Sequence, residues 1–198
     1  MSIVRIGILG GVFDPVHLGH LSVALLAKER FGLSEVLFVP SGAPPHKPSV
    51  AASPEDRLNM LKLALLGVDG CRVWDGELRR EGYSYTIDTL AELSGVYRGA
   101  EFYFIIGTDN LPEIRKWRSY EDIIAKVTVC VAYRPGYDFG AATALAPAKI
   151  EEFPGPRWGA SSTMLREYIG KGHSCRFMIP DAALGYIRER GLYGYSHE

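Results

Sequence analysis

Two histidines stand three residues apart, shortly after a pair of glycines, in the segment Gly10 to His20. The segment follows an apolar run, Ile3 to Leu9, which is typical of a buried parallel strand, and precedes apolar residues at helical spacing. At such a strand-to-helix crossing, glycines let the backbone approach a ligand, and the first N–H groups of the helix can bind an anion. His17 and His20 can face the same side of the first helical turn. This pattern indicates a site where two imidazoles and several amides meet a phosphate.

Two other interpretations of the histidine pair stay open. Both imidazoles could act as helix caps with solvent or backbone partners, which is the commoner role of a histidine pair taken alone. A metal site would need a third and a fourth ligand, and no cysteine pattern or His-Glu-x-x-His arrangement supplies them. The segment is neither of the commoner phosphate loops, because Gly7 and Gly10 do not begin a G-x-G-x-x-G pattern and Lys171 is followed by glycine. Only the phosphate interpretation uses the glycines, the preceding strand and both histidines together.

The elements that must position these residues alternate between strand and helix. The predicted strands cover residues 3–9, 35–40, 71–75, 102–106 and 127–133, with a short further strand around 150–153. This alternation predicts a Rossmann-like, doubly wound α/β fold with a mostly parallel sheet of five to six strands. We expect a single domain over residues 1–198. Its C-terminal helical part, roughly 160–198, is expected to pack on the sheet edge and to complete the site.

Ligands of such sheets bind beyond the carboxyl ends of the strands. Four segments fall there in this sequence: Gly10–Gly11, Ser41–Lys47, Gly107–Asn110 and Arg134.

Local signals also predict how several helices begin and where charged side chains lie. Ser53 is the expected N-cap of one helix, Ser161-Ser162-Thr163 is expected to cap a second, and Thr86 is a candidate N-cap of a third. Arg57 lies in the first turn after Ser53, where it is expected to be a solvated charge or an ion-pair partner. The mixed-charge segment 77–81 is expected to be a solvated loop.

Composition excludes several classes of function. The formal net charge is −1, so no global basic field draws the protein to nucleic acid or to an anionic membrane. The apolar runs are far shorter than the roughly 20 residues of a membrane span. We expect no signal peptide, because the chain enters a strand within a few residues. Three widely spaced cysteines, Cys71, Cys130 and Cys175, predict reduced core thiols and a cytoplasmic location.

Phe13-Asp14-Pro15 followed by His17-Leu18-Gly19-His20 resembles the signature of the nucleotidylyltransferase superfamily. Along its whole length the chain resembles the bacterial nicotinate mononucleotide adenylyltransferases, through further motifs in the same order. These are Phe38-Val39-Pro40 with Pro44-Pro45-His46-Lys47, Arg57-x-x-Met60-Leu61, Ser84-Tyr85-Thr86-x-x-Thr89-Leu90, Gly107-Thr108-Asp109 with Trp117, Arg134-Pro135-Gly136, Ser161-Ser162-Thr163-x-x-Arg166 and Leu192-Tyr193. The ordered combination is much more specific than the first motif. Residues 154–160 depart from the pattern, since similar proteins usually have an apolar β-branched residue beside the Ser-Ser-Thr.

The resemblance implies transfer of AMP from ATP to nicotinate mononucleotide, giving deamido-NAD and pyrophosphate in NAD biosynthesis. The acceptor phosphate already carries a nucleophilic oxygen, so the site must align it with the α-phosphorus of ATP and neutralise the leaving pyrophosphate. The catalytic residues implied are His17, His20 and Arg166. The ATP-binding residues implied are Gly10, Gly11, Phe13, His17, His20, Asp109, Arg134, Ser161, Ser162, Thr163 and Arg166. The acceptor-binding residues implied are Pro44, His46, Lys47, Tyr85, Thr86, Asp109 and Trp117.

Within the implied acceptor site, Thr86 and the nearby helix N–H groups would meet the ring carboxylate, and Trp117 would stack on the pyridinium ring. Otherwise Thr86 is a cap and Trp117 a packed aromatic residue. Mg²⁺ is expected to enter with ATP, held mainly by the phosphates, since the sequence offers no dedicated carboxylate cage. No nucleic-acid or membrane partner is expected, and a homo-oligomer is compatible with the sequence.

Other functions stay open. The acceptor could be nicotinamide mononucleotide or phosphopantetheine, and the protein could be a nucleotide sensor without turnover. A sensor should have lost one of the two histidines or Arg166, and this sequence keeps all three. A ligase resembling an aminoacyl-tRNA synthetase core would need an RNA-binding appendage, for which 198 near-neutral residues leave no obvious room.

Overall fold

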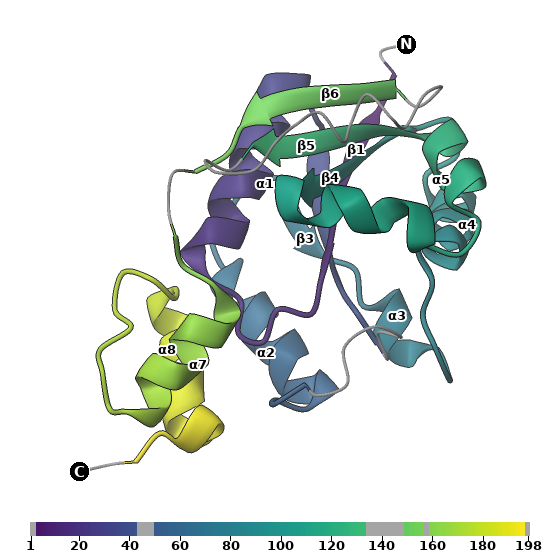
Figure 1. Cartoon of the computed structure of the whole chain (residues 1–198). Helices are drawn as coiled ribbons and strands as arrows, with labels where there is room; N and C mark the ends of the chain where they lie inside the picture. Colours follow the sequence, from purple (N-terminus) through teal and green to yellow (C-terminus); the bar gives the residue numbers. More distant parts are fainter. Residues whose placement is uncertain (1–2, 43–49, 134–148, 157–158, 197–198) are drawn as a thin grey trace.

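The sheet of this protein has six strands, and every pairing between them is parallel. The structure is a computed structural model and describes residues 3–42, 50–133, 149–156 and 159–196. The strands are β1 (Arg5–Gly11), β2 (Glu35–Pro40), β3 (Cys71–Val73), β4 (Glu101–Gly107), β5 (Val127–Tyr133) and β6 (Lys149–Pro154). They lie in the order β3-β2-β1-β4-β5-β6 (Figure 1). The order reverses between β1 and β4, which is where doubly wound sheets bind ligands. The predicted fold class is confirmed.

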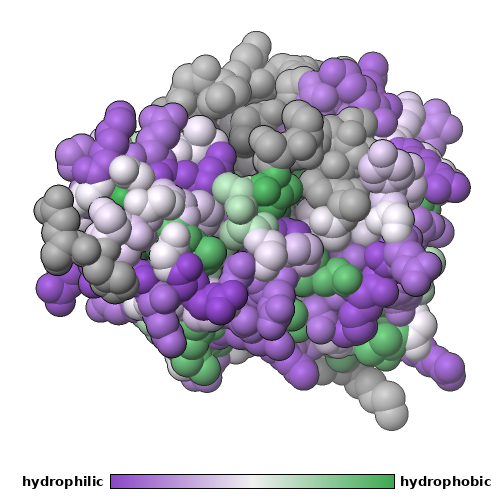
Figure 2. Space-filling view, turned by 90° about the horizontal axis from the view of Figure 1, so that it is seen from below, coloured by the Kyte–Doolittle hydropathy of each residue, from purple (hydrophilic) through white to green (hydrophobic). Residues whose placement is uncertain are grey.

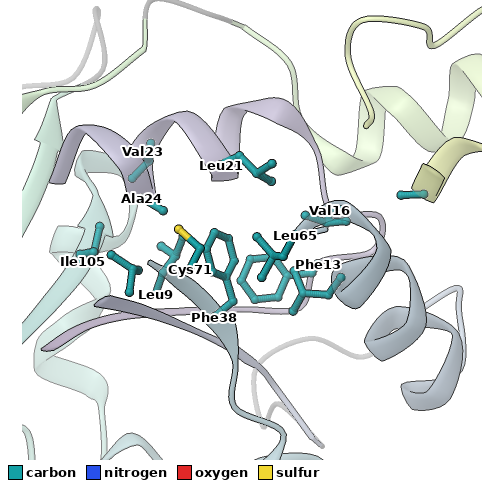
Figure 3. Close-up of a cluster of buried hydrophobic side chains, with 14 of the residues drawn as sticks. Leu9, Phe13, Val16, Leu21, Val23, Ala24, Phe38, Leu65, Cys71 and Ile105 are labelled. Carbon is teal, nitrogen blue, oxygen red and sulfur yellow. The ribbon is translucent and has the colours of Figure 1, made fainter. Parts of the chain in front are cut away.

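Helices cover both faces of this sheet (Figure 1). They are α1 (Leu18–Phe31), α2 (Pro54–Ala64), α3 (Gly76–Arg79), α4 (Thr86–Val96), α5 (Tyr120–Lys126), α7 (Ser162–Gly170) and α8 (Asp181–Glu189), with 3-10 helices η1 (Thr108–Lys116) and η2 (Leu192–Gly194). Because successive strand side chains point to opposite faces, β1 sends Ile8 to one buried cluster and Leu9 to the other. Figure 3 shows the Leu9 cluster, in which Phe38 and Ile105 pack beneath Ala24 of α1.

Two of the predicted caps are confirmed. The Ser53 hydroxyl accepts a hydrogen bond from the Asp56 N–H at 3.0 Å, and the Ser161 hydroxyl accepts one from the Met164 N–H at 3.2 Å. Thr86 is not the N-cap of α4, because Tyr85 occupies that position and Thr86 is the first helical residue.

The C-terminal helices lie elsewhere than predicted. β6 forms the edge of the sheet, and α8 packs against α2 rather than on that edge (Figure 1). Ala183 and Ile187 of α8 share a buried cluster with Met60 and Leu61 of α2. An amphipathic helix shows which of its own faces is buried but does not identify its partner, so the sequence pattern alone could not choose between these two surfaces.

The predicted solvated loop at residues 77–81 is also wrong in part. Residues 76–79 form the short helix α3, and Glu77 is buried, with 8% of its surface exposed. The three cysteines are buried as predicted. Among the described residues, none of the helices combines the length and the apolar character needed to cross a membrane.

Candidate active site

The carboxyl end of β1 leaves backbone open at the point where the strand order reverses. Gly10 is exposed, and a Cβ atom built there would come no nearer than 4.0 Å to a described heavy atom, Cζ of Phe104. Gly7 on the same strand differs, because its Cβ would lie 2.8 Å from Cδ1 of Leu33. Packing therefore requires the glycine at position 7 but not at position 10. A glycine that packing does not require fits a site where a ligand approaches the backbone.

The two histidines form the start of α1. His17 is the N-cap residue, and its backbone N–H donates to Nδ1 of His20 at 3.2 Å. Their ring centroids are 3.8 Å apart, so the imidazoles lie together as predicted. A neutral His20 ring that accepts at Nδ1 carries its proton on Nε2, where it can donate a hydrogen bond. A Cβ at Gly19 would lie 2.9 Å from the His17 ring, which explains the glycine between the histidines.

Phe13 packs its buried ring against His20 rather than offering the ring to a ligand. The Phe13 ring is only 2% exposed and meets the His20 ring edge to face, with centroids 5.0 Å apart. Its backbone has φ of 52°, in the left-handed region that non-glycine residues seldom adopt. Such conformations cluster at functional sites, where the surrounding structure holds them in place.

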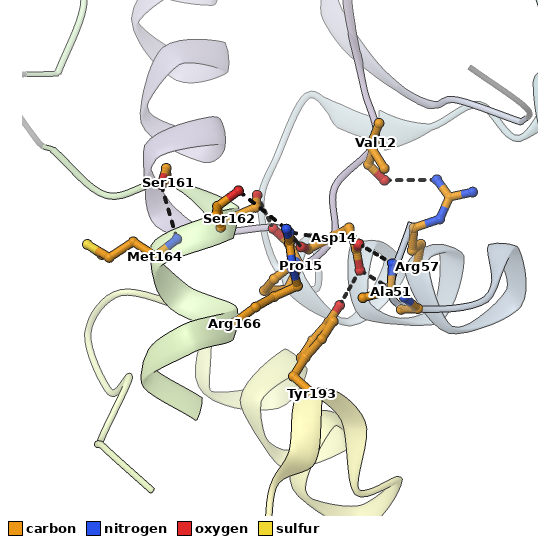
Figure 4. A network of polar contacts seen from close by, with 12 residues as sticks. Val12, Asp14, Pro15, Ala51, Arg57, Ser161, Ser162, Met164, Arg166 and Tyr193 are labelled. Carbon is orange, nitrogen blue, oxygen red and sulfur yellow. Dashed lines mark hydrogen bonds and ion pairs between the residues drawn. The ribbon is translucent and has the colours of Figure 1, made fainter. Parts of the chain in front are cut away.

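Asp14 fastens this turn to two distant parts of the chain (Figure 4). Its buried carboxylate accepts hydrogen bonds from the N–H groups of Ala51 and Ala52, at 2.7 and 3.1 Å, and from the Tyr193 hydroxyl at 2.7 Å. Burial, together with the hydrogen bond and negative charge of Asp14, raises the pKa of Tyr193. Tyr193 therefore stays a neutral donor. The segment before α2 and the segment after α8 are thus both tied to the β1–α1 turn.

Arg57 holds the same turn from α2. Its Nη1 donates to the carbonyl oxygens of Val12 at 2.8 Å and Ser41 at 2.9 Å, and the residue is 1% exposed. Burial lowers the pKa of its guanidinium, and the charge of Asp14 opposes that effect. The alternative of a solvated charge is wrong. The hydrogen-bond partners of Arg57 are carbonyls just beyond β1 and just beyond β2, and the negative charge of Asp14 acts on its guanidinium.

The N-terminus of α7 reaches the turn, as predicted. Arg166 donates from Nη1 to the backbone oxygen of Asp14 at 2.7 Å and from Nη2 to the Thr163 hydroxyl at 3.3 Å. The Ser162 hydroxyl donates to the Pro15 carbonyl at 2.9 Å (Figure 4). Neither α1 nor α7 carries an acidic residue in its first turn, so both N-termini keep their preference for an anion.

A second group of predicted residues lies at the start of α4 and just after η1. The Arg118 guanidinium lies 4.7 Å from the centre of the Tyr85 ring. Because Arg118 directly follows Trp117, this contact brings the start of α4 close to the chain at Trp117. Trp117 packs edge to face on Phe104, with ring centroids 5.5 Å apart, and Cζ of Phe104 would lie 4.0 Å from a Cβ atom built at Gly10. The structure therefore links the start of α4, Trp117 and the turn after β1. No sequence pattern pointed to Arg118.

Comparison with known proteins agrees with this arrangement. A family model described as cytidylyltransferase-like matches residues 8–168. A protein of Oceanobacillus iheyensis named as a probable nicotinate-nucleotide adenylyltransferase is 38% identical over 191 residues, covering 96% of this chain and 97% of that protein. A protein of the same name from a Synechococcus species is 42% identical over 197 residues, covering 96% and 94%. This chain belongs to the nicotinate-nucleotide adenylyltransferase family.

A solved structure related to the nicotinate-nucleotide adenylyltransferase family by name shares the fold. It is a Plasmodium falciparum nicotinic acid mononucleotide adenylyltransferase complexed with NaAD, with a TM-score of 0.83 at 20% identity. The match covers 98% of this chain and 100% of that one.

Several residues implied by the family motifs cannot be placed. Pro44, His46, Lys47 and Arg134 lie outside the described residues, and only the backbone place of Asp109, at the start of η1, is described. In the part of the chain that is described, no three His, Cys, Asp or Glu side chains gather as a metal site.

Figure 2 views the molecule from the side of α2, α7 and α8, where hydrophilic residues surround small hydrophobic groups.

Proposed function

We propose that this protein transfers the adenylyl group of ATP to nicotinate mononucleotide and releases pyrophosphate. An oxygen of the acceptor phosphate attacks the α-phosphorus of ATP, and the bond from that phosphorus to the bridging oxygen of the β-phosphate breaks. The products are deamido-NAD, which joins the two nucleotides through a new phosphoanhydride bond, and pyrophosphate, which takes the electron pair of the broken bond. No protein nucleophile is required, because the acceptor brings its own.

The observation that carries this proposal is the arrangement at the end of β1 and in the turn after it, where open glycine backbone and two adjoining imidazoles meet the N-termini of α1 and α7. Donors fixed before the reaction stabilise charge that develops in the transition state more strongly than donors that must reorganise. His17 and His20 would donate to the reacting phosphates. Arg166, through guanidinium N–H groups beyond those given to Asp14 and Thr163, and the first N–H groups of α7 would bind the β- and γ-phosphates, whereas the single Ser162 hydroxyl hydrogen is given to Pro15.

The remaining roles follow the family motifs. Gly10, Gly11 and the backbone of Phe13 would border ATP, with Asp109, Arg134, Ser161 and Thr163 completing that side. Tyr85, Thr86 and Trp117 would bind the acceptor, with Asp109 and the residues Pro44, His46 and Lys47. Mg²⁺ would come with ATP and take most of its ligands from phosphate and water oxygens, as this ion prefers. Three buried thiols fit a reducing, cytoplasmic setting.

A pyrophosphate-release assay over four reactions tests this function. Purified protein with ATP and Mg²⁺ is given nicotinate mononucleotide, nicotinamide mononucleotide, phosphopantetheine or no acceptor. We expect the highest kcat/KM with nicotinate mononucleotide and identification of deamido-NAD by mass. A higher kcat/KM with another acceptor would reassign the substrate. ATP binding without release of pyrophosphate from any acceptor would identify a sensor instead.

A further inference from the structure

Glu77 is a buried carboxylate that the proposed mechanism does not use. It lies in α3, with 8% of its surface exposed, and its Oε1 accepts a hydrogen bond from the Thr89 hydroxyl at 2.6 Å. Burial raises the pKa of this carboxyl group, while the Thr89 hydrogen bond and the charge of Arg80 oppose the increase. A buried ionisable group persists only where partners compensate its desolvation. Its partners therefore show what it holds together.

One partner is the end of the β2 segment. Gly42, two residues after β2, packs directly against α3 and helps to lower the pKa of the Glu77 carboxyl group. Gly42 also lies so close to α3 that a Cβ atom there would stand 2.4 Å from the Glu77 carbonyl oxygen and 2.9 Å from the Ser84 hydroxyl oxygen. Only glycine fits this contact without movement of the backbone. The chain leaving β2 is therefore pressed against Glu77.

The other partners lie before and within α4. Ser84 donates its hydroxyl hydrogen to the Glu77 carbonyl at 3.2 Å, and Thr89 belongs to the second turn of α4. Arg80 extends the network, since its Nη1 lies 3.5 Å from the Thr89 hydroxyl and its Nη2 donates to Glu92 at 2.6 Å. Glu77 thus joins the exit of β2 to both sides of the Tyr85–Thr86 junction.

We propose that Glu77 is a positioning residue for acceptor recognition, fixing Gly42 and the start of α4 at one spacing so that Tyr85 and Thr86 meet the acceptor. This inference rests on the proposed function, because it takes the start of α4 as part of the acceptor site. The Glu77 carboxylate itself does not contact the substrate. Loss of this carboxylate should therefore weaken binding of the acceptor. Binding of ATP should be unchanged, because Arg57 and Arg166 still hold the turn after β1.

Steady-state kinetics of a matched pair of variants test this role. Thr89→Val keeps the shape of the side chain but removes the hydroxyl, whereas Thr89→Ser keeps the hydroxyl. We expect Thr89→Val and Glu77→Gln to raise the KM for nicotinate mononucleotide about tenfold, because the first removes the donor of this buried hydrogen bond and the second removes the charge of its acceptor. In both variants the KM for ATP should stay near the wild-type value. Thr89→Ser should have wild-type KM values for both substrates.

Leu93→Ala provides the control for a merely structural role, because Leu93 is a buried residue of α4 that none of these hydrogen bonds involves. It should lower Tm without separating the two KM values. Thr89→Val with an unchanged acceptor KM, or with both KM values raised equally, would overturn the inference while wild-type turnover still supports the proposed function. A wild-type protein that does not adenylylate nicotinate mononucleotide would overturn both.

Discussion

The two histidines after β1 have different surroundings. The His17 ring is buried and lies on Gly19, whereas the half-buried His20 ring accepts the His17 N–H and rests on Phe13. His20 thus combines a capping role with a donor role, because accepting at Nδ1 places the proton of its neutral ring on Nε2. In the proposed function each residue would contribute one donor, and neither would have to act as a nucleophile.

His17→Ala and His20→Ala should each retain the fold and lose about 10²–10³ in kcat, the usual result of removing one donor to a transition-state anion. Pyrophosphate release measures the loss, and far-UV circular dichroism checks the fold. His173→Ala is the matched control, because His173 is exposed and meets the Tyr168 ring edge to face instead. Wild-type kcat in a folded double variant would contradict the phosphate role.

Arg166 has a structural bond as well as its proposed role toward pyrophosphate. Arg166→Ala should raise the KM for ATP and lower kcat, because a guanidinium gains contact energy as charge builds on the leaving group. It should also lower the free energy of unfolding by about 1 kcal/mol, since the Asp14 carbonyl loses its donor. Kinetics and urea unfolding separate the two effects. If Arg166→Ala lowers stability but leaves kcat and the KM for ATP unchanged, Arg166 only stabilises the fold through its hydrogen bond to Asp14 and does not bind pyrophosphate.

At the scale of elements, α2 and α8 are joined through Asp56. Its carboxylate accepts hydrogen bonds from the hydroxyls of Ser53 at 2.6 Å and Tyr186 at 2.9 Å, and Nε of Arg190 lies 3.5 Å away. The Ser53 bond contributes most to holding the pKa of Asp56 below its ordinary value of 3.8, against the effect of burial. A carboxyl group with a lowered folded-state pKa stabilises the protein above its unfolded-state pKa and stops doing so as pH falls through the folded value.

Asp56→Asn should therefore lower the free energy of unfolding by about 1–2 kcal/mol near neutral pH. The difference from the wild type should shrink as the pH falls below 3.8, where the wild-type carboxylate begins to protonate. Urea unfolding across this range measures it. Glu55→Gln, an exposed carboxylate in the same helical turn, should show little change. A difference that stays constant down to low pH would show that the charge of Asp56 contributes nothing.

The start of α4 is the element proposed to select the acceptor. Thr86→Ala should narrow the ratio of kcat/KM for nicotinate over nicotinamide mononucleotide, because the acid loses a charge-assisted hydrogen bond of about 1.5–3 kcal/mol. Thr86→Ser should keep the ratio. Trp117→Ala should weaken both acceptors alike and leave the KM for ATP nearly unchanged. If Thr86→Ala leaves the ratio of kcat/KM for the two acceptors unchanged, another residue recognises the carboxylate.

At the scale of the whole molecule, local patterns sufficed for the sheet and for the turn after β1. The apolar run before Gly10, the spacing of the histidines and the serine caps are short-range signals that the folded chain keeps. Such local signals could not predict the burial of Arg57 and Glu77 or their partners. Arg57 donates to Val12 and Ser41, 45 and 16 positions away, and Glu77 binds Thr89, 12 positions away. Only the tertiary fold brings those partners together.

The same limit applies to the C-terminal helices and to the second side of the site. Tyr193 reaches Asp14 across 179 positions, and α8 meets α2 because their apolar faces fit, which no local pattern encodes. Family motifs proposed Tyr85, Thr86 and Trp117 as a group without giving their geometry. The contact of Arg118 with Tyr85 supplies part of it.

The stereochemical course at the α-phosphorus tests direct transfer at the turn after β1 most directly. An ATP analogue made chiral at that phosphorus by sulfur is reacted with nicotinate mononucleotide, and phosphorus NMR identifies the product diastereomer. A single in-line attack by the acceptor phosphate inverts the configuration, and inversion is the result we predict. Retention would require two displacements through an adenylylated side chain such as His17 or His20, and would contradict the account.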